Sequence, residues 1–432
     1  MNSTIYKTLK LTQNLTKELM LDLKNGNLKG NERNDELGKI NPLLWEFGHV
    51  INFWIEKTCK YINLDVEELK ENHLYDSFRT DREARFDSIF KIDDFFKLEE
   101  VYNSIINQIL KFLFNIDCVY IDPVCSYIIN LGVLHNMMHI ESFYFSRQLL
   151  GLSKPKSLQT VKNIENEIPI MTEMIKIKGG NFLQGWDDSN NNFTFDNEKP
   201  AHIRSVSDFQ ISKYPITNHQ YMKFILDKGY FKKEYWTPEG WRWKEKNNIA
   251  LPLYWEWNIN NQKFMYQRWD KIEEILPNNP IYHISWYEAL AFAKWSGGRL
   301  PTESEWEYLA TNKGTTLYPW GDKQPDESRG NINFKLDGPT NVTFYPLGEN
   351  NDKIEGLIGN IWEWCMEPIY PYDGFKIDPI YREMSYPFFG YKNICRGGAW
   401  CVPGHLINSK YRNAQAPDCR IQYIGFRIVL EN

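Results

Sequence analysis

PIYHISWYEALAFAKWSGGRLPTESEWEYLA, residues 280–310, carries the clearest helix signals in the second half of the chain. The run WYEALAFAKWSG (286–297) predicts one helix, and TESEWEYLA (302–310) predicts a second, shorter one. Thr302 and Glu305 have the spacing of a capping box, in which each side chain bonds the backbone amide of the other residue. No other stretch of this half is as convincingly helical.

The sequence around this helix pair has a different pattern. From about residue 171 it runs in short β-type segments such as MIKIKGGNFLQG (174–185) and HIRSVSDFQISKYPI (202–216), separated by turn residues. The 16 Trp, 25 Tyr and 25 Phe of the chain are not arranged here in helical stripes, but sit among Gly, Asn, Asp and Pro. We therefore predict an irregular, loop-rich domain over 171–432, preceded by a polar, proline-punctuated linker over 153–170.

The first 150 residues are predicted to be helical. Apolar residues recur there at spacings of three and four in four stretches, 5–23, 43–62, 98–114 and 119–150. Four such helices predict an antiparallel bundle over residues 1–152, and thus an α+β chain with two domains. The segment HLYDSFRTDREARFDSIF (73–90) is too charged for a core and too long for a tight connection, so it is a candidate active-site segment.

Composition narrows the class of partner and the compartment. A net charge of -6 over 432 residues, with no basic block, argues against nucleic acid. Seven cysteines without regular spacing indicate reduced thiols. The first twenty residues lack the apolar core of a signal peptide, and no run of about 18 apolar residues occurs, so we expect a cytoplasmic protein with no membrane span.

Three of the eight histidines are candidate metal ligands. His135 and His139 in VLHNMMHIESF stand at i and i+4, so on a helix they share one face. Glu141 falls about 200° around the helix from His139, which makes it a structural group rather than a ligand. His49 lies in the apolar stretch NPLLWEFGHVINFWIEK beside Gly48, and a mid-helix glycine, costing about 1 kcal/mol, indicates that something approaches closely there.

Residue types and spacing alone leave the metal open. Three neutral imidazoles can hold zinc or iron, and they leave coordination positions for substrate and for water or dioxygen. The plainer alternative is that each histidine is a satisfied core or surface residue.

The second half resembles the sulfatase-modifying-factor, or formylglycine-generating-enzyme, domain, which implies a C-type-lectin-like fold. The matching motifs stand in order as GGNFLQG, NEKPAH, KYPITNHQYMKF, the 280–310 stretch, YPWGD, GNIWEWC, RGGAW and GFRIV. The first half looks like a DinB-type four-helix bundle, through NPLLWEFGHV and HNMMHIE. This pairing is similar to the iron-dependent sulfoxide synthases of ergothioneine biosynthesis over essentially the whole chain.

The resemblance implies an Fe(II) site held by His49, His135 and His139, with substrates bound where the two domains meet. It implies that the imidazole of hercynine (trimethylhistidine, a histidine betaine), a thiolate and O2 react to give a C–S bond at the imidazole C2 carbon and a sulfoxide. A tyrosine acts there as proton or electron donor, and the pattern YREMS makes Tyr381 its match, with Tyr386 as second choice.

The resemblance also implies substrate-binding residues. Arg82 and Arg85, in TDREARF, match a pair of arginines that hold the carboxylates of the sulfur donor, for which guanidinium forks are suited. Asn413, in KYRNAQAPD, matches an asparagine that holds the histidine-derived substrate.

Several positions depart from the family's best-characterised branch, and they cluster on substrate contacts: Met138, Met384, Ala414 and Gln415. The stretches NPLLWEFGHV, LYDSFRTDREARFD and HNMMHIESF look closer to the branch that includes selenoneine synthases, which use a selenium donor. Donor and acceptor identity are therefore open, and they include an ovothiol-type sulfoxide synthase that acts on histidine itself.

Three other functions are weighed against this one. A DinB-type thiol transferase would use zinc to activate a small thiol. A non-catalytic binding module would need no catalytic metal. Formylglycine generation needs a copper-binding cysteine pair, but Cys401 has no second cysteine near NSKYR. Cys365, Cys395 and Cys419 are expected as core thiols, and the Trp, Gly and Arg residues of the WGD and RGG segments are expected to build the core and turns.

Overall fold

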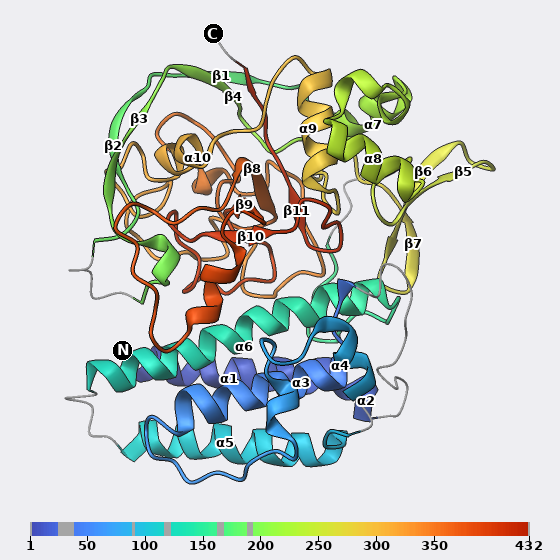
Figure 1. Cartoon of the computed structure of the whole chain (residues 1–432). Helices are drawn as coiled ribbons and strands as arrows, with labels where there is room; N and C mark the ends of the chain where they lie inside the picture. Colours follow the sequence, from blue (N-terminus) through green and yellow to red (C-terminus); the bar gives the residue numbers. More distant parts are fainter. Residues whose placement is uncertain are drawn as a thin grey trace. The chain divides into compact units, whose positions relative to one another are not determined.

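The computed structural model divides into two compact units, Met1–Pro155 and Lys156–Asn432 (Figure 1). It describes residues 2–24, 39–88, 91–115, 122–161, 168–187 and 193–430. Helices make up the first unit, and short strands with a few helices make up the second. The predicted α+β class is therefore confirmed.

In the described part of the first unit, α1 and α3 each pack against both α5 and α6 (Figure 1). The elements are α1 Asn2–Leu19, α2 Leu21–Lys24, α3 Leu43–Phe53, the π-helical η2 Trp54–Cys59, the 3-10 helix η3 Asn72–Tyr75, α4 Arg82–Ser88, α5 Phe95–Asn115 and α6 Pro123–Leu149. Asp122 caps α6 by accepting a 2.6 Å bond from the amide of Val124.

Three of the predicted helices differ in detail, and the one expected over 5–23 is divided at Met20 into α1 and α2. The helix expected over 43–62 is α3, continued by the π-helical turn η2 and ending at Cys59. Of the helix expected over 119–150, residues 119–121 lie outside the described part of the chain. The candidate segment 73–90 folds into η3 and α4, with residues 89–90 likewise outside the described part.

A buried polar network ties the bundle together. The amide oxygen of Asn136 on α6 accepts bonds from the indole of Trp54 (3.2 Å) and the hydroxyl of Tyr102 (2.9 Å). Thr16 on α1 completes the network, because its hydroxyl accepts from the Asn136 amide at 3.3 Å. Buried polar groups are costly unless they are paired, so this network specifies how α1, η2, α5 and α6 pack.

The segment predicted as a linker, 153–170, contains the boundary between the two units, and its described residues from 156 onward belong to the second unit. Leu158 and Val161 are buried, and the amide of Val161 donates a 2.8 Å bond to Asp337 of the second unit. The amide of Ile170 donates similarly to Asn278 at 2.8 Å. Apolar side chains and satisfied amides thus hold residues 156–161 and 168–170 on the second unit, while 162–167 lie outside the described part.

The second unit contains short strands in four sheets. The strands are β1 Met174–Ile177, β2 Gly180–Gln184, β3 His202–Val206, β4 Phe209–Ser212, β5 Trp255–Asn258, β6 Lys263–Arg268, β7 Lys271–Glu274, β8 Trp362–Pro368, β9 Asn393–Arg396, β10 Asn413–Gln415, β11 Ile424–Gly425 and β12 Val429–Leu430. Their orders are β1-β4-β12, β2-β3, β5-β6-β7 and β10-β9-β8-β11. Only the β8–β11 pair among these is parallel, with Ile424 opposite Trp362.

Four α-helices accompany these strands: α7 Asn218–Leu226, α8 Pro238–Lys246, α9 Trp286–Trp295 and α10 Glu303–Ala310. Short 3-10 turns are η4 Asp196–Glu198, η5 Gly229–Phe231, η6 Lys233–Tyr235, η7 Pro346–Gly348, η8 Arg382–Met384 and η9 Tyr386–Phe388. The predictions of α9, of α10 and of the Thr302–Glu305 capping box are confirmed. α7 and α8 are not among the predicted helices, although Thr217 and Thr237 cap them.

Buried ion pairs explain the motifs of the second unit. Arg427 binds Glu363 with two bonds of 2.6 and 2.7 Å, and Glu363 also accepts from the indole of Trp306. Arg396 of the RGG motif is fully buried and donates a 2.7 Å bond to Glu307 on α10. Removing one partner of such a pair typically costs about 3–5 kcal/mol. These motif residues build the core, as expected.

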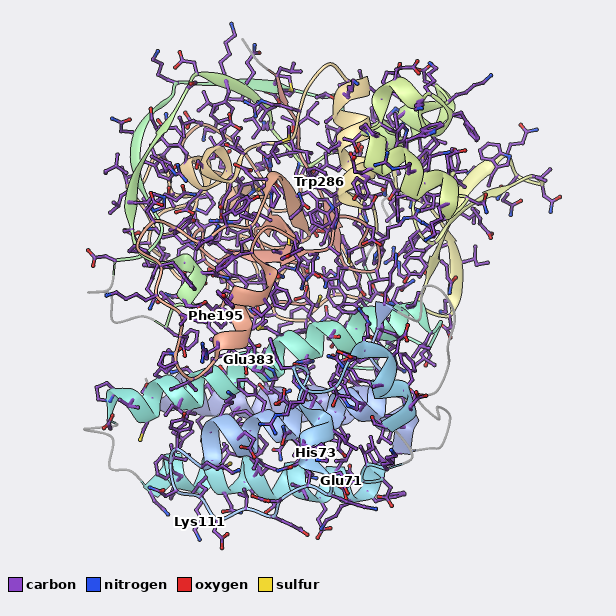
Figure 2. The ribbon with its side chains drawn as sticks, viewed as in Figure 1. Glu71, His73, Lys111, Phe195, Trp286 and Glu383 are labelled. Atoms are coloured by element: carbon purple, nitrogen blue, oxygen red, sulfur yellow. The ribbon has the colours of Figure 1, made fainter. Side chains whose placement is uncertain are left out.

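Two of the three cysteines expected in the core, Cys365 and Cys395, are buried there. Trp286 begins α9 (Figure 2), and its indole donates a 2.8 Å bond to the carbonyl of Cys365. Cys365 and Cys395 are buried free thiols, whereas Cys419 is only partly buried. Among the described residues, no helix has both the length and the apolarity needed to cross a bilayer.

Candidate metal centre

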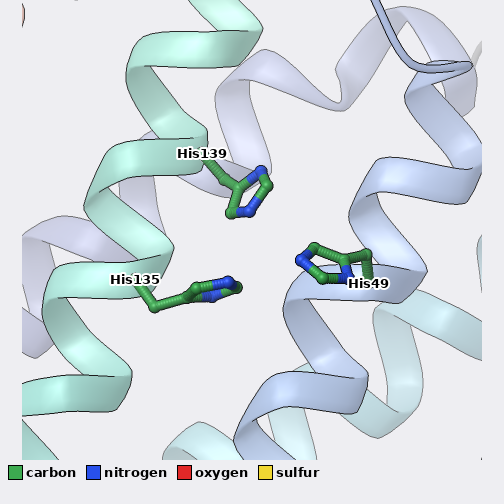
Figure 3. Close-up of side chains that lie close together, drawn as sticks. All are labelled: His49, His135 and His139. Atoms are coloured by element: carbon green, nitrogen blue, oxygen red, sulfur yellow. The ribbon is translucent and has the colours of Figure 1, made fainter. Parts of the chain in front are cut away.

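The three predicted histidines converge in the first unit (Figure 3). His49 comes from the middle of α3, and His135 and His139 come from adjacent turns of α6. One ring nitrogen of each lies within 4.8 Å of the other two. The ring centroids are 5.2 Å apart for His49–His135, 4.9 Å for His49–His139 and 4.6 Å for His135–His139. The structure thus brings these residues together across two helices.

Hydrogen bonds orient two of the rings. Nδ1 of His49 donates to the backbone carbonyl of Tyr75 at 2.7 Å, since a carbonyl can only accept. Nδ1 of His139 lies 2.6 Å from the carboxylate of Glu46, which is also an acceptor when ionised. A proton on Nδ1 leaves the Nε2 lone pair for a metal, and such outer partners are typical of metal-bound histidine.

Burial keeps the imidazoles of His49 and His135 in the neutral form that can bind a metal. It lowers the pKa of His49 to about 3 and the pKa of His135 well below its ordinary value. For Glu46 burial acts in the opposite direction, but the bond to His139 and the charge on that ring outweigh it and lower the carboxyl pKa. His49 and His135 are therefore neutral near pH 7, and Glu46 is ionised.

Aromatic rings hold the ligands from the side. Phe53 stacks on His135, with the ring centroids 3.6 Å apart and an angle of 6° between the ring planes. Trp45 stacks on His49 at 5.3 Å and 8°. These contacts restrict rotation of both imidazoles and place apolar surface beside them.

The donor set fits a divalent transition metal. Nitrogens bound at about 2.1 Å to one ion lie at most about 4.2 Å apart, so a small closure of the three rings suffices. Three neutral imidazoles suit iron or zinc and leave positions for exogenous ligands. Glu141 is not part of this group, in agreement with the expected angle around α6.

Gly48 has the close approach that its position predicted. A Cβ at Gly48 would lie 1.9 Å from Cε1 of Tyr75, the residue whose carbonyl holds His49. Only glycine lets η3 pack this close to α3. The glycine therefore supports the histidine group indirectly, because it lets Tyr75 approach His49.

The two predicted arginines of α4 have different surroundings. Arg82 is exposed at the start of the helix. Arg85 is half-buried, and each of its three guanidinium nitrogens donates to a protein oxygen: Nε to Thr80 O (3.0 Å), Nη1 to Asn41 Oδ1 (2.7 Å) and Nη2 to Ser77 O (2.8 Å).

Tyr381 belongs to the second unit, in a segment anchored by two carboxylates. Asp196 accepts from the hydroxyl of Ser385 at 2.5 Å and from the amide of Asp378 at 3.2 Å. Asp378 in turn accepts from the amide of Tyr381 at 2.9 Å. Burial raises the pKa of the Tyr381 phenol, so it stays protonated, whereas Tyr386 is 67% exposed.

Asn413, also in the second unit, is the first residue of β10. Its backbone pairs with Cys395 of β9, and its side-chain oxygen accepts a 2.8 Å bond from the amide of Ala414. The carboxamide orientation is thus defined by its own strand.

Sequence reasoning missed two groups of the centre, Glu46 and the carbonyl of Tyr75. Glu46 had a usable signal, because it is a charged residue in an apolar helix three positions before His49 and so on the same face. The carbonyl had none, since every residue has one.

Comparisons with known proteins agree with this description. Residues 160–432 match the model of the sulfatase-modifying factor enzyme 1-like domain. Hercynine oxygenase of Mycobacterium tuberculosis is 33% identical over 253 residues, 57% of this chain and 58% of the relative. Formylglycine-generating enzyme of the same organism is 26% identical, over 61% of this chain and 99% of the relative. The chain thus spans less than two thirds of the length of the hercynine oxygenase.

One solved structure with similarity is PvdO from Pseudomonas aeruginosa. It covers 62% of this chain and 100% of its own, with 17% identity and a TM-score of 0.42.

Proposed function

The chain belongs to the family of sulfatase-modifying factor enzyme 1-like domains, and on this premise we propose that it is a non-haem Fe(II), O2-dependent oxidoreductase that joins sulfur or selenium to the imidazole C2 carbon of hercynine. The similarity to hercynine oxygenase supports the acceptor. The activity corresponds to a step of ergothioneine or selenoneine biosynthesis.

One observation carries the proposal: three imidazoles from α3 and α6 converge within 4.8 Å of one another, and burial lowers the pKa of two of them, His49 and His135. A purely structural role in the bundle would not need three imidazoles from two helices to converge. A non-catalytic binding module would not need them either. The arrangement supports a metal centre with open positions, which oxygen chemistry requires.

Each residue of the centre has a proposed role. Iron(II), when bound by the three histidines, supplies positions for substrates and reactivity toward dioxygen. Glu46 and the carbonyl of Tyr75 hold the tautomers of His139 and His49. The stacked rings of Trp45 and Phe53 keep the imidazoles from turning and exclude water from their faces.

In the second unit, we propose that Tyr381 donates a proton or hydrogen atom from its phenol oxygen, because its raised pKa keeps the phenol protonated near neutral pH. Asn413 is proposed to bind the histidine-derived substrate, and Arg82 to bind a carboxylate of the donor.

A cytoplasmic location is part of the proposal. All six cysteines among the described residues are free thiols, which suits a reducing compartment.

A zinc-dependent thiol transferase is the second candidate, favoured by the same three-imidazole donor set, because zinc takes such ligands equally well. The two candidates differ in their need for oxygen. A sulfoxide synthase acting on histidine itself differs in the acceptor.

The test uses the full chain loaded anaerobically with Fe(II). Hercynine or histidine is added with a thiol or a selenium donor, then oxygen is admitted, and oxygen uptake and product mass are recorded. We expect uptake only with both substrates present, and a product whose mass contains acceptor plus donor atom. Turnover without oxygen would instead support the transferase.

The matched variants are His139→Ala and His73→Ala. His73 lies in the same unit (Figure 2), but its side chain is 52% exposed and is not part of the histidine group. We expect His139→Ala to lose bound iron and activity and His73→Ala to keep both. Unchanged activity in His139→Ala would refute the proposal.

A further inference from the structure

Arg85 is connected to two of the three metal-binding histidines, although it touches neither. Its Nη1 donates to Asn41 at 2.7 Å, and the amide of Asn41 donates to Oε2 of Glu46 at 3.3 Å. The other oxygen of Glu46 lies 2.6 Å from Nδ1 of His139. A continuous chain of hydrogen bonds therefore runs from the guanidinium to one ligand.

A second connection runs through an aromatic ring. The guanidinium carbon of Arg85 lies 4.4 Å from the ring centroid of Trp45, within cation–π distance. The ring of Trp45 stacks on His49, and its indole nitrogen donates a 2.7 Å bond to the carbonyl of Leu74. Trp45 is fully buried in a close-packed interior, so a shift of its ring would displace the imidazole of His49 that stacks on it.

The third connection is through the backbone. Arg85 closes the turn that follows η3, because its Nε and Nη2 donate to the carbonyls of Thr80 and Ser77. Tyr75, whose carbonyl holds His49, is the last residue of η3. Fixing this turn fixes the carbonyl that sets the tautomer of His49.

From these three connections we infer that Arg85 is a positioning residue of the metal centre, and that carboxylate binding by the sulfur or selenium donor falls to other groups. The inference rests on the proposed function for the existence of the metal centre. The guanidinium of Arg85 is held in place, because each of its three nitrogens donates a hydrogen bond to a protein oxygen. A substrate-binding fork is expected to keep a parallel pair of N–H groups for its ligand.

Metal affinity separates the two roles without relying on turnover. The full chain is stripped of metal and titrated with Co(II) against a chromophoric chelator, and its visible Co(II) absorption spectrum is recorded. Outer-shell substitutions typically lower metal affinity by about 10–100-fold. We expect about a tenfold or larger loss and a changed spectrum in Arg85→Met, and at most a twofold change in Arg82→Met, the control on the same helix.

Two further variants remain informative even if Arg85→Met folds poorly. Asn41→Ala keeps the guanidinium and removes only the link to Glu46, and Arg85→Lys keeps the charge but not the fork. Both are expected to weaken Co(II) binding while thermal unfolding and circular dichroism stay near wild type.

The inference would be overturned by variants with wild-type Co(II) affinity and spectrum but a raised KM for the donor. That outcome would place Arg85 in the donor site and leave the proposed function intact. A wild-type chain that binds no divalent metal would overturn both.

Discussion

Replacing Gly48 by alanine gives opposite outcomes for a free helix and for this fold. In an isolated helix the change should stabilise by about 1 kcal/mol, because glycine is a poor helix former. In this protein the new Cβ would lie 1.9 Å from Cε1 of Tyr75, so the ring must retreat by about 1.6 Å to reach an ordinary contact of about 3.5 Å.

The cost follows from the surroundings of that ring. Tyr75 is fully buried, its hydroxyl accepts from the amide of Asp93 at 3.2 Å, and its carbonyl holds His49. Overpacking of this kind typically costs about 1–3 kcal/mol. Because this ring is buried and bonded at two points, we take the upper part of that range, about 2–3 kcal/mol. Deducting about 1 kcal/mol of helix propensity leaves a net loss of about 1–2 kcal/mol, or roughly 2–8 °C in Tm for a unit of this size.

Thermal unfolding followed by far-ultraviolet circular dichroism measures this change, because the long helices α1, α5 and α6 all belong to the first unit. We expect weaker Co(II) binding as well, since the Tyr75 carbonyl moves with its ring. A double-mutant cycle with Tyr75→Leu provides the control, because the smaller side chain makes room for the methyl group. Gly48→Ala should be neutral or stabilising in the Tyr75→Leu background. A Gly48→Ala variant with a Tm at or above that of the wild type would refute the packing argument.

Four further outcomes are expected. Glu46→Gln should lower Co(II) affinity by about tenfold in chelator competition, because the charged partner of His139 is lost. Removing bound metal with a chelator should lower Tm, since a ligand at 100 times its Kd stabilises by about 2.7 kcal/mol. Burial raises the pKa of Glu198 to about 8. Between about pH 4.5 and 8 the native state therefore holds more protons than the unfolded state, and the stability of the protein falls as the pH rises. Glu198→Gln should flatten the decline of Tm between about pH 5.5 and 8.5. Asp196→Ala should speed hydrogen exchange across 378–388, because two anchoring bonds are removed, and equal exchange in variant and wild type would contradict that anchoring role.

The centre was predictable where its chemistry depends on local geometry. His135 and His139 share a face because residues four apart always do on a helix, and α6 obeys that rule. His49 could be identified from the sequence because a histidine in an apolar helix needs a polar partner or a metal ion inside the fold. The resemblance to the sulfatase-modifying factor domain is confirmed over residues 160–432, since its motifs are numerous and ordered.

Two helices of the second unit, α7 and α8, show where prediction from helix caps and apolar spacing reaches its limit. α7 and α8 are short, and their helical signals compete with neighbouring turn residues. Their threonine caps were visible in the sequence, but a cap alone does not distinguish a helix from a turn. The burial of Leu158 and Val161 in the predicted linker was equally hard to foresee, since two isolated apolar residues in a polar segment give no sign of the surface that buries them.

The amino-acid sequence by itself determined the two-unit order, the helical period of the first 150 residues, and the three histidines that could share an ion. Only the tertiary structure decided that Tyr75 offers a carbonyl to His49, that Glu46 faces His139, and that Arg85 bonds into the support of both. The difference is physical. Periodicity is a property of one helix, whereas a hydrogen bond between residues 26 or 93 positions apart exists only after separate segments have packed.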